Sequence, residues 1–194
     1  DEYLPEPTPT PSPTATTEST VPAPEPTPVP VKPDREFTEY VNAALGFQIS
    51  HPEDFRIDES KFEGWRDDVI IDSPVGQAGE YMTLTISVAD AGDLTMAELQ
   101  SGTGDAKLEI GGLSLGGDIT NTTLGGLPAI EQNLVMDSPF SFVEESLADR
   151  RFRALTTIHN DKIYAVSYYY SEATDKDIEE KEVLEYIVST MEFI

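Results

Sequence analysis

The chain has 194 residues, with 37 acidic and 12 basic side chains, a net charge of −25 and no cysteine. The missing cysteine excludes disulfide frameworks, thiolate metal sites and cysteine catalysis. The negative charge argues against binding to nucleic acid or to anionic lipid surfaces, both of which select basic patches. No apolar run reaches the roughly 18 residues that a membrane-spanning helix needs. We therefore expect no nucleic acid partner and no transmembrane span, and the sequence indicates no cofactor.

Residues 1–36 form a segment rich in proline and threonine, called here the proline-rich segment. It holds eleven of the 15 prolines and seven threonines, and it contains no glycine. Alternating prolines remove backbone donors and favour the polyproline II conformation, while too few apolar side chains remain to offset the entropy of ordering. We predict a disordered linker that would reach on the order of 110 Å when fully extended, at about 3.1 Å per residue.

A linker of this kind suggests that the folded part is held at a distance from an attachment point. We expect an exported protein, extracellular or on the cell surface, with a lipid anchor upstream of residue 1 as in bacterial or archaeal lipoproteins. The same composition fits an O-glycosylated surface segment or a linker within a longer chain. In the folded part, Asn121-Thr122-Thr123 forms a sequon that predicts N-glycosylation at Asn121 if the export route supports it.

Residues 37–194 suit a single domain, since a chain of this length buries a sizeable core. The proline-rich segment carries seven acids and two bases, so its net charge of −5 leaves −20 for the folded part. This negative field permits cationic partners or divalent ions, including Ca²⁺. A general solubilising surface is the simpler interpretation.

The first half of the folded part alternates apolar and polar residues as strands do. This pattern predicts strands at residues 46–52, 55–58, 68–74 and 81–89. The clearest is 81–89, in which Met82, Leu84, Ile86 and Val88 share one face and polar side chains share the other. The spacing of Thr95 and Glu98 matches a capping box and predicts a short helix over 95–100.

The second half predicts two hairpins. Residues 102–126 are rich in glycine, but residues 118–123 within them favour a strand, and Gly125-Gly126 predicts a tight turn into a strand at 127–136. The strongest hairpin signal joins strands 150–159 and 162–170 around Asn160-Asp161. Its second strand has apolar or aromatic residues on both faces, so we place it in the middle of the sheet.

A helix is predicted to follow the capping box that Thr174 and Asp177 form. The apolar stripe of this helix packs on the sheet and comprises Ile178, Val183, Leu184, Ile187, Val188 and Met191. Glu179, Glu180, Glu182 and Glu185 are expected to face water. Strands outnumber helices, so the fold class is α+β, an antiparallel β-sheet flanked by helices.

Four segments resemble the PsbP-like family in their order and spacing. They are the "LGFQISHPEDF" of residues 45–55, the "LGGLPA" of 124–129, the "DKIYAVSY" of 161–168 and the "YIVSTMEF" of 186–193. Phe55 stands where the family usually has tryptophan. The family positions that match, Phe47, Pro52, Gly126 and Pro128, have structural roles. The resemblance implies a PsbP-like α/β sandwich over residues 37–194.

The resemblance implies a fold but no single activity. Plant and cyanobacterial members assist photosystem II and influence its calcium and chloride requirement. A fold relative binds the nuclear-transport GTPase Ran, and many bacterial and archaeal members look like secreted lipoproteins. We therefore expect a partner protein at the cell envelope.

Catalytic and metal-binding motifs are scarce. The sequence has two histidines and contains neither Gly-x-Ser-x-Gly nor His-Glu-x-x-His. His51 and His159 could hold a metal ion with Asp161 or Asp54 if their strand ends converge. The alternative is that both histidines are ordinary turn or surface residues.

Arg151 and Arg153 belong to the main basic cluster of an acidic chain and share one strand face. Together with Tyr168 and Tyr170 on the neighbouring strand, they form a candidate patch for binding a partner protein. Two alternatives remain open. The arginines could balance a neighbouring acidic helix, and the tyrosines could be core residues beneath the last helix.

Three functional hypotheses follow from these features. The first is a non-enzymatic, tethered domain that binds or stabilises a partner protein or complex. The second is a hydrolase or divalent-cation-binding protein whose site is built on loops from acids and histidines. The third is a structural spacer in the cell envelope.

Overall fold

The computed structural model describes residues 30–62, 66–74, 82–101, 119–135 and 151–194. Residues 1–29, for which disorder was predicted, lie outside these ranges. So do residues 102–118 of the glycine-rich stretch and Arg150, the first residue of the predicted strand 150–159. The first strand begins at Phe37, where the sequence places the start of the folded part. The division into a linker and one domain itself stays a prediction.

The described residues form two antiparallel sheets and two helices. The smaller sheet has the order β1-β2-β10 and the larger has the order β3-β4-β5-β9-β8-β7-β6. The strands are β1 (Phe37–Asn42), β2 (Phe47–Pro52), β3 (Arg56–Phe62), β4 (Arg66–Asp72), β5 (Thr83–Asp90), β6 (Ile119–Leu124), β7 (Leu127–Val135), β8 (Arg151–His159), β9 (Lys162–Tyr170) and β10 (Glu192–Phe193). The helices are α1 (Met96–Ser101) and α2 (Asp175–Ser189).

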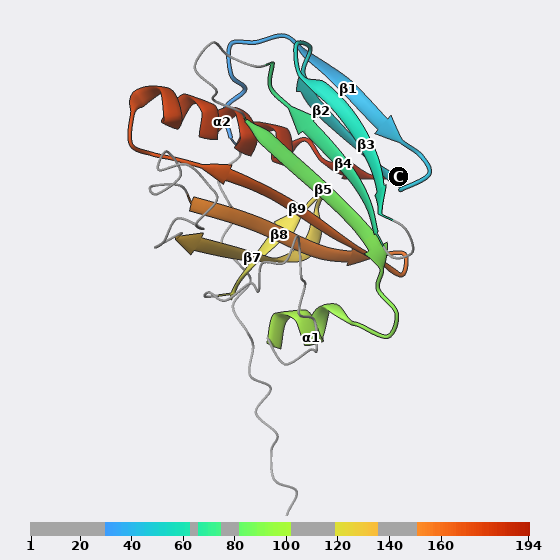
Figure 1. Ribbon diagram of the computed structural model, residues 1–194. Helices are drawn as coiled ribbons and strands as arrows, with labels where there is room; N and C mark the ends of the chain where they lie inside the picture. The colour runs from blue at the N-terminus through green and yellow to red at the C-terminus, as the bar shows by residue number, and fades with distance from the viewer. Residues whose placement is uncertain (1–29, 63–65, 75–81, 102–118, 136–150) are drawn as a thin grey trace, which may run out of the picture.

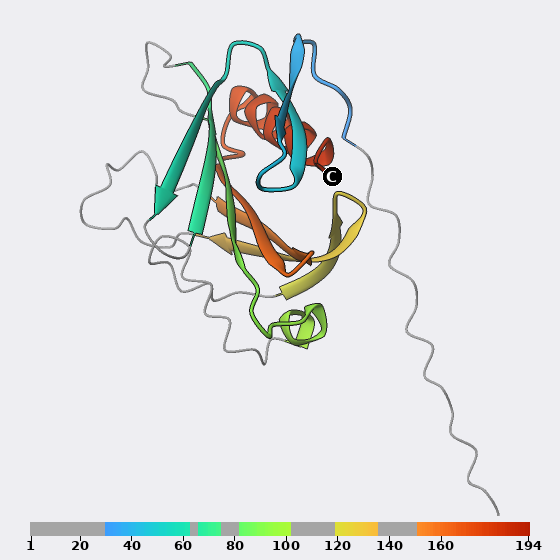
Figure 2. The same ribbon diagram turned by 90° about the vertical axis from the view of Figure 1, so that its right-hand side faces the viewer.

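The elements are stacked in layers around the larger sheet. Helix α2 and the smaller sheet cover one face, and α1 lies against the other (Figures 1 and 2). This arrangement confirms the predicted α+β class, an antiparallel sheet flanked by helices. Neither α1 nor α2 combines the length and the apolar character that crossing a bilayer would require.

Two tight turns set the registers of the β6–β7 and β8–β9 hairpins. Gly125 and Gly126 have φ angles of +57° and +78°, and Asn160 and Asp161 have φ angles of +48° and +59°. Positive φ at both central residues defines the type I′ turn, whose twist matches that of paired strands. Both hairpins therefore form where the sequence predicted them.

The main core lies between α2 and the facing side of the larger sheet. Leu84 and Ile86 of β5 and Val166 of β9 are fully buried there, as are Val183 and Ile187 of α2. Thr174 caps α2 through the capping box with Asp177 that was predicted. The rest of the predicted stripe is buried, but Ile178 is 42% exposed. It precedes Val183 by five residues, which places it about 140° around the helix from that residue.

The chain end joins the smaller sheet to the rest of the molecule. Strand β10 pairs with β2, and the Ile194 amide donates to the Gly46 carbonyl at 3.1 Å. The Tyr164 hydroxyl, from the larger sheet, donates to the Leu45 carbonyl at 2.7 Å. Strands β1 and β10 were not predicted, because β10 has only two residues and β1 lacks a clear apolar alternation.

The β6–β7 turn packs against the chain end and gives a matched pair of stability tests. A Cβ on Gly125 would lie 2.7 Å from the Phe193 ring and 3.1 Å from the Met191 carbonyl, whereas a Cβ on Gly126 would meet nothing within 4 Å. Both substitutions to alanine should cost about 1–2 kcal/mol for the left-handed conformation. Gly125→Ala should cost about 1–3 kcal/mol more because of the close contact. Urea unfolding of both variants measures this difference, and equal losses would contradict the packing described.

Candidate binding groove

A groove with a volume of about 620 Å³ opens between α2 and the strands at the β6 side of the larger sheet. We call it the groove throughout. Its residues come from three elements and from the start of the described chain. They are Thr122, Thr123, Gly125 and Gly126 of the β6–β7 hairpin, Arg153 and Leu155 of β8, Glu182, Glu185, Val188 and Ser189 from α2, and Pro30 and Val31.

The groove follows from how α2 sits on the sheet. The helix packs chiefly against β9 and against β2 of the smaller sheet. The larger sheet continues past β9 through β8 and β7 to β6, so the sheet is wider than the helix that covers it. Leu155 and Val188, 3% and 8% exposed, give the groove an apolar base. Thr122 and Ser189 add hydroxyl groups at its sides.

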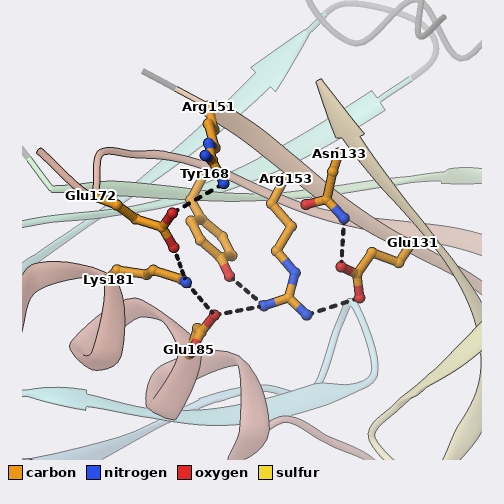
Figure 3. Close-up of polar contacts among 8 residues, drawn as sticks. All are labelled: Glu131, Asn133, Arg151, Arg153, Tyr168, Glu172, Lys181 and Glu185. Atoms are coloured by element: carbon orange, nitrogen blue, oxygen red, sulfur yellow. Dashed lines mark hydrogen bonds and ion pairs between the residues drawn. The ribbon is translucent and has the colours of Figure 1, made fainter. Parts of the chain in front are cut away.

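Arg153 links the sheet to the helix at the groove. Its guanidinium donates to Glu131 Oε2 at 2.8 Å and to Glu185 Oε1 at 3.1 Å, and it donates to the Tyr168 hydroxyl at 2.9 Å (Figure 3). Asn133 holds the other oxygen of Glu131 through a hydrogen bond of 2.7 Å. One cation therefore connects β7, β8, β9 and α2.

A second group of charges extends this network along α2. Lys181 contacts both Glu172 and Glu185, and Arg151 pairs with Glu172 at 3.0 Å (Figure 3). The Lys181 ammonium also lies 5.1 Å from the centre of the Tyr170 ring. Arg151 and Glu172 are more exposed than Arg153 and Glu131, so their pair contributes less to stability.

The pKa shifts at the groove keep Arg153 and Glu131 charged and Tyr168 neutral at pH 7. Burial acts to raise the pKa of Glu131, but hydrogen bonds from Arg153 and Asn133 outweigh it and hold that pKa below its ordinary value of 4.5. Burial also acts to lower the pKa of Arg153, yet the hydrogen bond to Glu131 leaves it raised. Burial raises the pKa of Tyr168 despite the nearby guanidinium, so this tyrosine is neutral at pH 7.

The four residues of the predicted partner patch do not form one exposed surface. Tyr168 is 1% exposed and Tyr170 packs against the main core, which matches the alternative of core residues beneath α2. Arg151 pairs with Glu172, just before α2, and Arg153 pairs with Glu185 of α2. Both pairs match the alternative that the arginines balance a neighbouring acidic helix. Of the four, Arg153 alone lines the groove.

The two candidate histidines lie on different sheets. His51 belongs to β2, where Nδ1 lies 2.8 Å from the Pro52 carbonyl oxygen. His159 ends β8, where Nε2 lies 3.0 Å from the side-chain Nδ2 of Asn160 and the ring contacts Phe193. Asp161 follows in the exposed turn. Within the described ranges, no three His, Cys, Asp or Glu side chains gather as a metal site.

Asn121 is exposed on β6, at one edge of the larger sheet. A sequon asparagine must be accessible to accept a glycan, and this position meets that condition. Glycosylation at Asn121 stays a prediction.

Sequence reasoning missed the acids that shape the groove. Glu185 was expected to face water, but it pairs with Arg153. Glu131 was not singled out, although the register of β7 on β8 puts Asn133 opposite Arg153 and Glu131 two residues away on the same face. That register was the missing signal, because residues 136–150 separate the two strands and hide their pairing in the sequence.

Comparison with known proteins supports the fold. No protein-family model matches the sequence, and a search of curated proteins found no match. The solution structure of cyanobacterial PsbP (CyanoP) from Synechocystis matches 81% of this chain and 92% of its own, with a TM-score of 0.56 and 14% sequence identity. The chain has a PsbP-like fold. At this identity the PsbP-like match concerns the fold alone.

Two further solved structures resemble the chain more weakly. LpqN of Mycobacterium tuberculosis, described as involved in cell envelope biogenesis, has a TM-score of 0.45 and 15% identity over 82% of this chain and 92% of its own. A Bacteroides thetaiotaomicron protein has a TM-score of 0.47 and 13% identity over 80% of this chain and 48% of its own. Neither match carries an argument about this chain.

Replacing Arg153 tests the network that fixes the helix to the sheet. Arg153→Met leaves Glu131 partly buried without its cation and leaves Glu185 only the distant Lys181, so it should lower the free energy of unfolding by about 2–4 kcal/mol. The matched control is Arg151→Met, which removes an exposed pair and should cost less than about 1 kcal/mol. Chemical denaturation at neutral pH measures both.

A compensated variant separates charge from packing. Arg153→Met combined with Glu131→Gln and Glu185→Gln should recover most of the lost stability, because no unpaired carboxylate remains. If Arg153→Met and Arg151→Met prove equally mild, the network does not hold α2 to the sheet.

The lowered pKa of Glu131 predicts a dependence of stability on pH. The unfolded chain binds a proton at Glu131 at higher pH than the folded chain does, so stability from this group is present above about pH 4.5 and is lost as pH falls through the lowered pKa. The difference in unfolding free energy between the parent protein and Glu131→Gln should therefore shrink between about pH 6 and about pH 3. Glu182→Gln is the control, and a constant difference for Glu131→Gln would refute the linkage.

Proposed function

We propose that the folded part is a binding module whose groove takes an extended, cationic segment of a partner protein. The proline-rich segment acts as a spacer that displays this module at the cell envelope, outside the cytoplasm. The observation that carries the proposal is the groove itself, an open depression of about 620 Å³ with an apolar base and an acidic side. Its volume lies within the roughly 300–1,000 Å³ of common ligand sites.

The charges along the groove favour a cation as its occupant. Arg153 is already shared by Glu131 and Glu185, so its charge is neutralised within the protein. Glu182 also lines the groove, is exposed, and takes part in no ion pair with the described residues. The groove therefore keeps an unbalanced negative charge in a chain whose net charge is −25. Charge complementarity of this kind guides encounter and selects partners.

The shape of the groove favours an extended segment. Its two glycines at the β6–β7 turn leave the backbone accessible to a ligand, and β6 runs along one side. Leu155 and Val188 offer apolar surface on which side chains of the ligand can pack. An extended segment with its basic side chains on one face would meet the acid, and the aliphatic stems of those side chains would lie on the apolar base.

Binding is better supported than catalysis by the described residues. The hydroxyl groups at the groove, those of Thr122, Thr123 and Ser189, have no histidine beside them, because His51 and His159 lie elsewhere. A nucleophile needs such a base within hydrogen-bond reach. The proline-rich composition supports the exported, tethered setting.

A charge-reversal pair tests this function. The probe is a short fluorescein-labelled peptide in which lysine alternates with valine and threonine, and fluorescence anisotropy measures its binding to the full chain. The lysine peptide should bind saturably, and its analogue with glutamate in place of lysine should not. Glu182→Lys should weaken binding by about three- to tenfold, as expected for loss of a charge at the side of an interface.

Glu179→Lys provides the matched control, since it makes the same change in net charge on an exposed position of α2 that does not line the groove. It should change binding far less than Glu182→Lys. No saturable binding of the lysine peptide, or equal effects of the two variants, would overturn the proposed function.

A further inference from the structure

The two edges of the larger sheet differ in chemistry. Its edge strands are β3 and β6. Strand β3 has the sequence RIDESKF, with four charged residues, and charged edges discourage pairing with another chain. Strand β6 has the sequence ITNTTL, with neither charge nor proline and with four β-branched residues. Among the described strands, β6 is bonded only by β7, and no described strand pairs with its other side, called here the open side.

The β6–β7 turn indicates which backbone groups face the open side. Leu124 and Leu127 flank a two-residue type I′ turn, so they form a hydrogen-bonded pair. Antiparallel partners alternate between bonded and non-bonded pairs, which directs the backbone groups of Thr123, Asn121 and Ile119 away from β7. Pro128 lies opposite Thr123 and fits this register, because proline cannot donate to β6. We call these three N–H and C=O pairs the open edge.

The open edge is continuous with the groove. Thr122 and Thr123 belong to β6 and also line the groove. A strand laid along β6 would therefore project alternate side chains over the groove, toward Glu182 and the apolar base. Ile119 is 38% exposed and adds apolar surface at the far end of the edge.

We propose that the partner segment binds by β-strand addition, extending the larger sheet at the open edge of β6 while its basic side chains reach the acidic side of the groove. In this mode main-chain hydrogen bonds supply affinity and alternate side chains supply specificity. The inference rests on the proposed function and adds the geometry of the bound segment. A second copy of this chain is a poor occupant, because its β6 carries no cation for Glu182 and both copies are strongly acidic.

Backbone N-methylation of the lysine peptide tests strand addition directly. Two versions are made, one methylated at every lysine and the other at every valine and threonine. In a strand, successive residues direct their N–H groups to opposite sides, so only one of these sets can donate to β6. One version should therefore lose at least about tenfold in affinity and the other should stay near the unmodified peptide. Equal affinities of the two versions would overturn strand addition.

The protein side is tested by Asn121→Pro, with Asn121→Ala as its control. Both variants remove the same side chain and the sequon, but only proline removes a donor of the open edge. Asn121 faces away from β7, so the ladder between β6 and β7 keeps its bonds, and unfolding curves verify that both variants fold. Asn121→Pro should weaken binding of the lysine peptide by about five- to tenfold relative to Asn121→Ala.

The outcomes separate the two proposals. If the unmodified lysine peptide binds and Glu182→Lys weakens it, but N-methylation and Asn121→Pro have no selective effect, the groove binds the segment without strand addition. If the lysine peptide does not bind at all, the proposed function fails. Formation of a dimer that Asn121→Pro abolishes would assign the open edge to a second copy and would also overturn the inference.

Discussion

The structure depends on one cation shared between two carboxylates. Arg153 projects from β8 toward α2 and is held by Glu131 on one side and Glu185 on the other. Its hydrogen bond to Tyr168 anchors it to β9 as well. The apolar cluster that holds α2 on β5 and β9 also includes Leu155 of β8 and Leu124 of β6. The ion network adds a charged link from the helix to β8 and β7 at the groove.

The same arrangement underlies the charge selectivity that we propose for the groove. A free arginine beside an apolar depression would suggest a carboxylate or phosphate ligand. Here both Nη atoms of the guanidinium bond to neighbouring side chains, its buried Nε has no hydrogen-bond partner, and Glu182 remains unpaired with any described residue. A PsbP-like fold alone does not assign a function. The distribution of charge around this groove and the uncharged edge strand beside it are properties of this chain, and they point to an extended, basic partner.

Much of the fold could be predicted because local signals and tertiary structure agree. The β8–β9 hairpin, the Gly125-Gly126 turn and the capping box at Thr174 each depend on residues close together in the sequence. Strand β10 escaped prediction because its pairing with β2 joins distant parts of the chain, and β1, although it forms a local hairpin with β2, lacks a clear apolar alternation. Ile178 was placed in the core stripe from its apolar character, but the helical period sets it on another face.

The groove was harder to predict than the fold. Arg153 was singled out from the sequence, whereas the acids that hold it come from β7 and α2 and meet it only after folding. Tyr168 showed the reverse problem, since a tyrosine next to arginines suggests a binding surface but here completes a core. Burial and strand register decide these roles, and a single sequence reports neither directly.

The most direct test is an NMR titration of the full chain with the lysine–valine–threonine peptide. Backbone amide shifts would be followed for every assigned residue. The account predicts that the largest changes gather at residues 119–124 and around Glu182 and Arg153, with slowed amide exchange at Ile119, Asn121 and Thr123. Shifts confined to α1, to β3 or to the smaller sheet would contradict it, because they would place the partner away from the groove and its open edge.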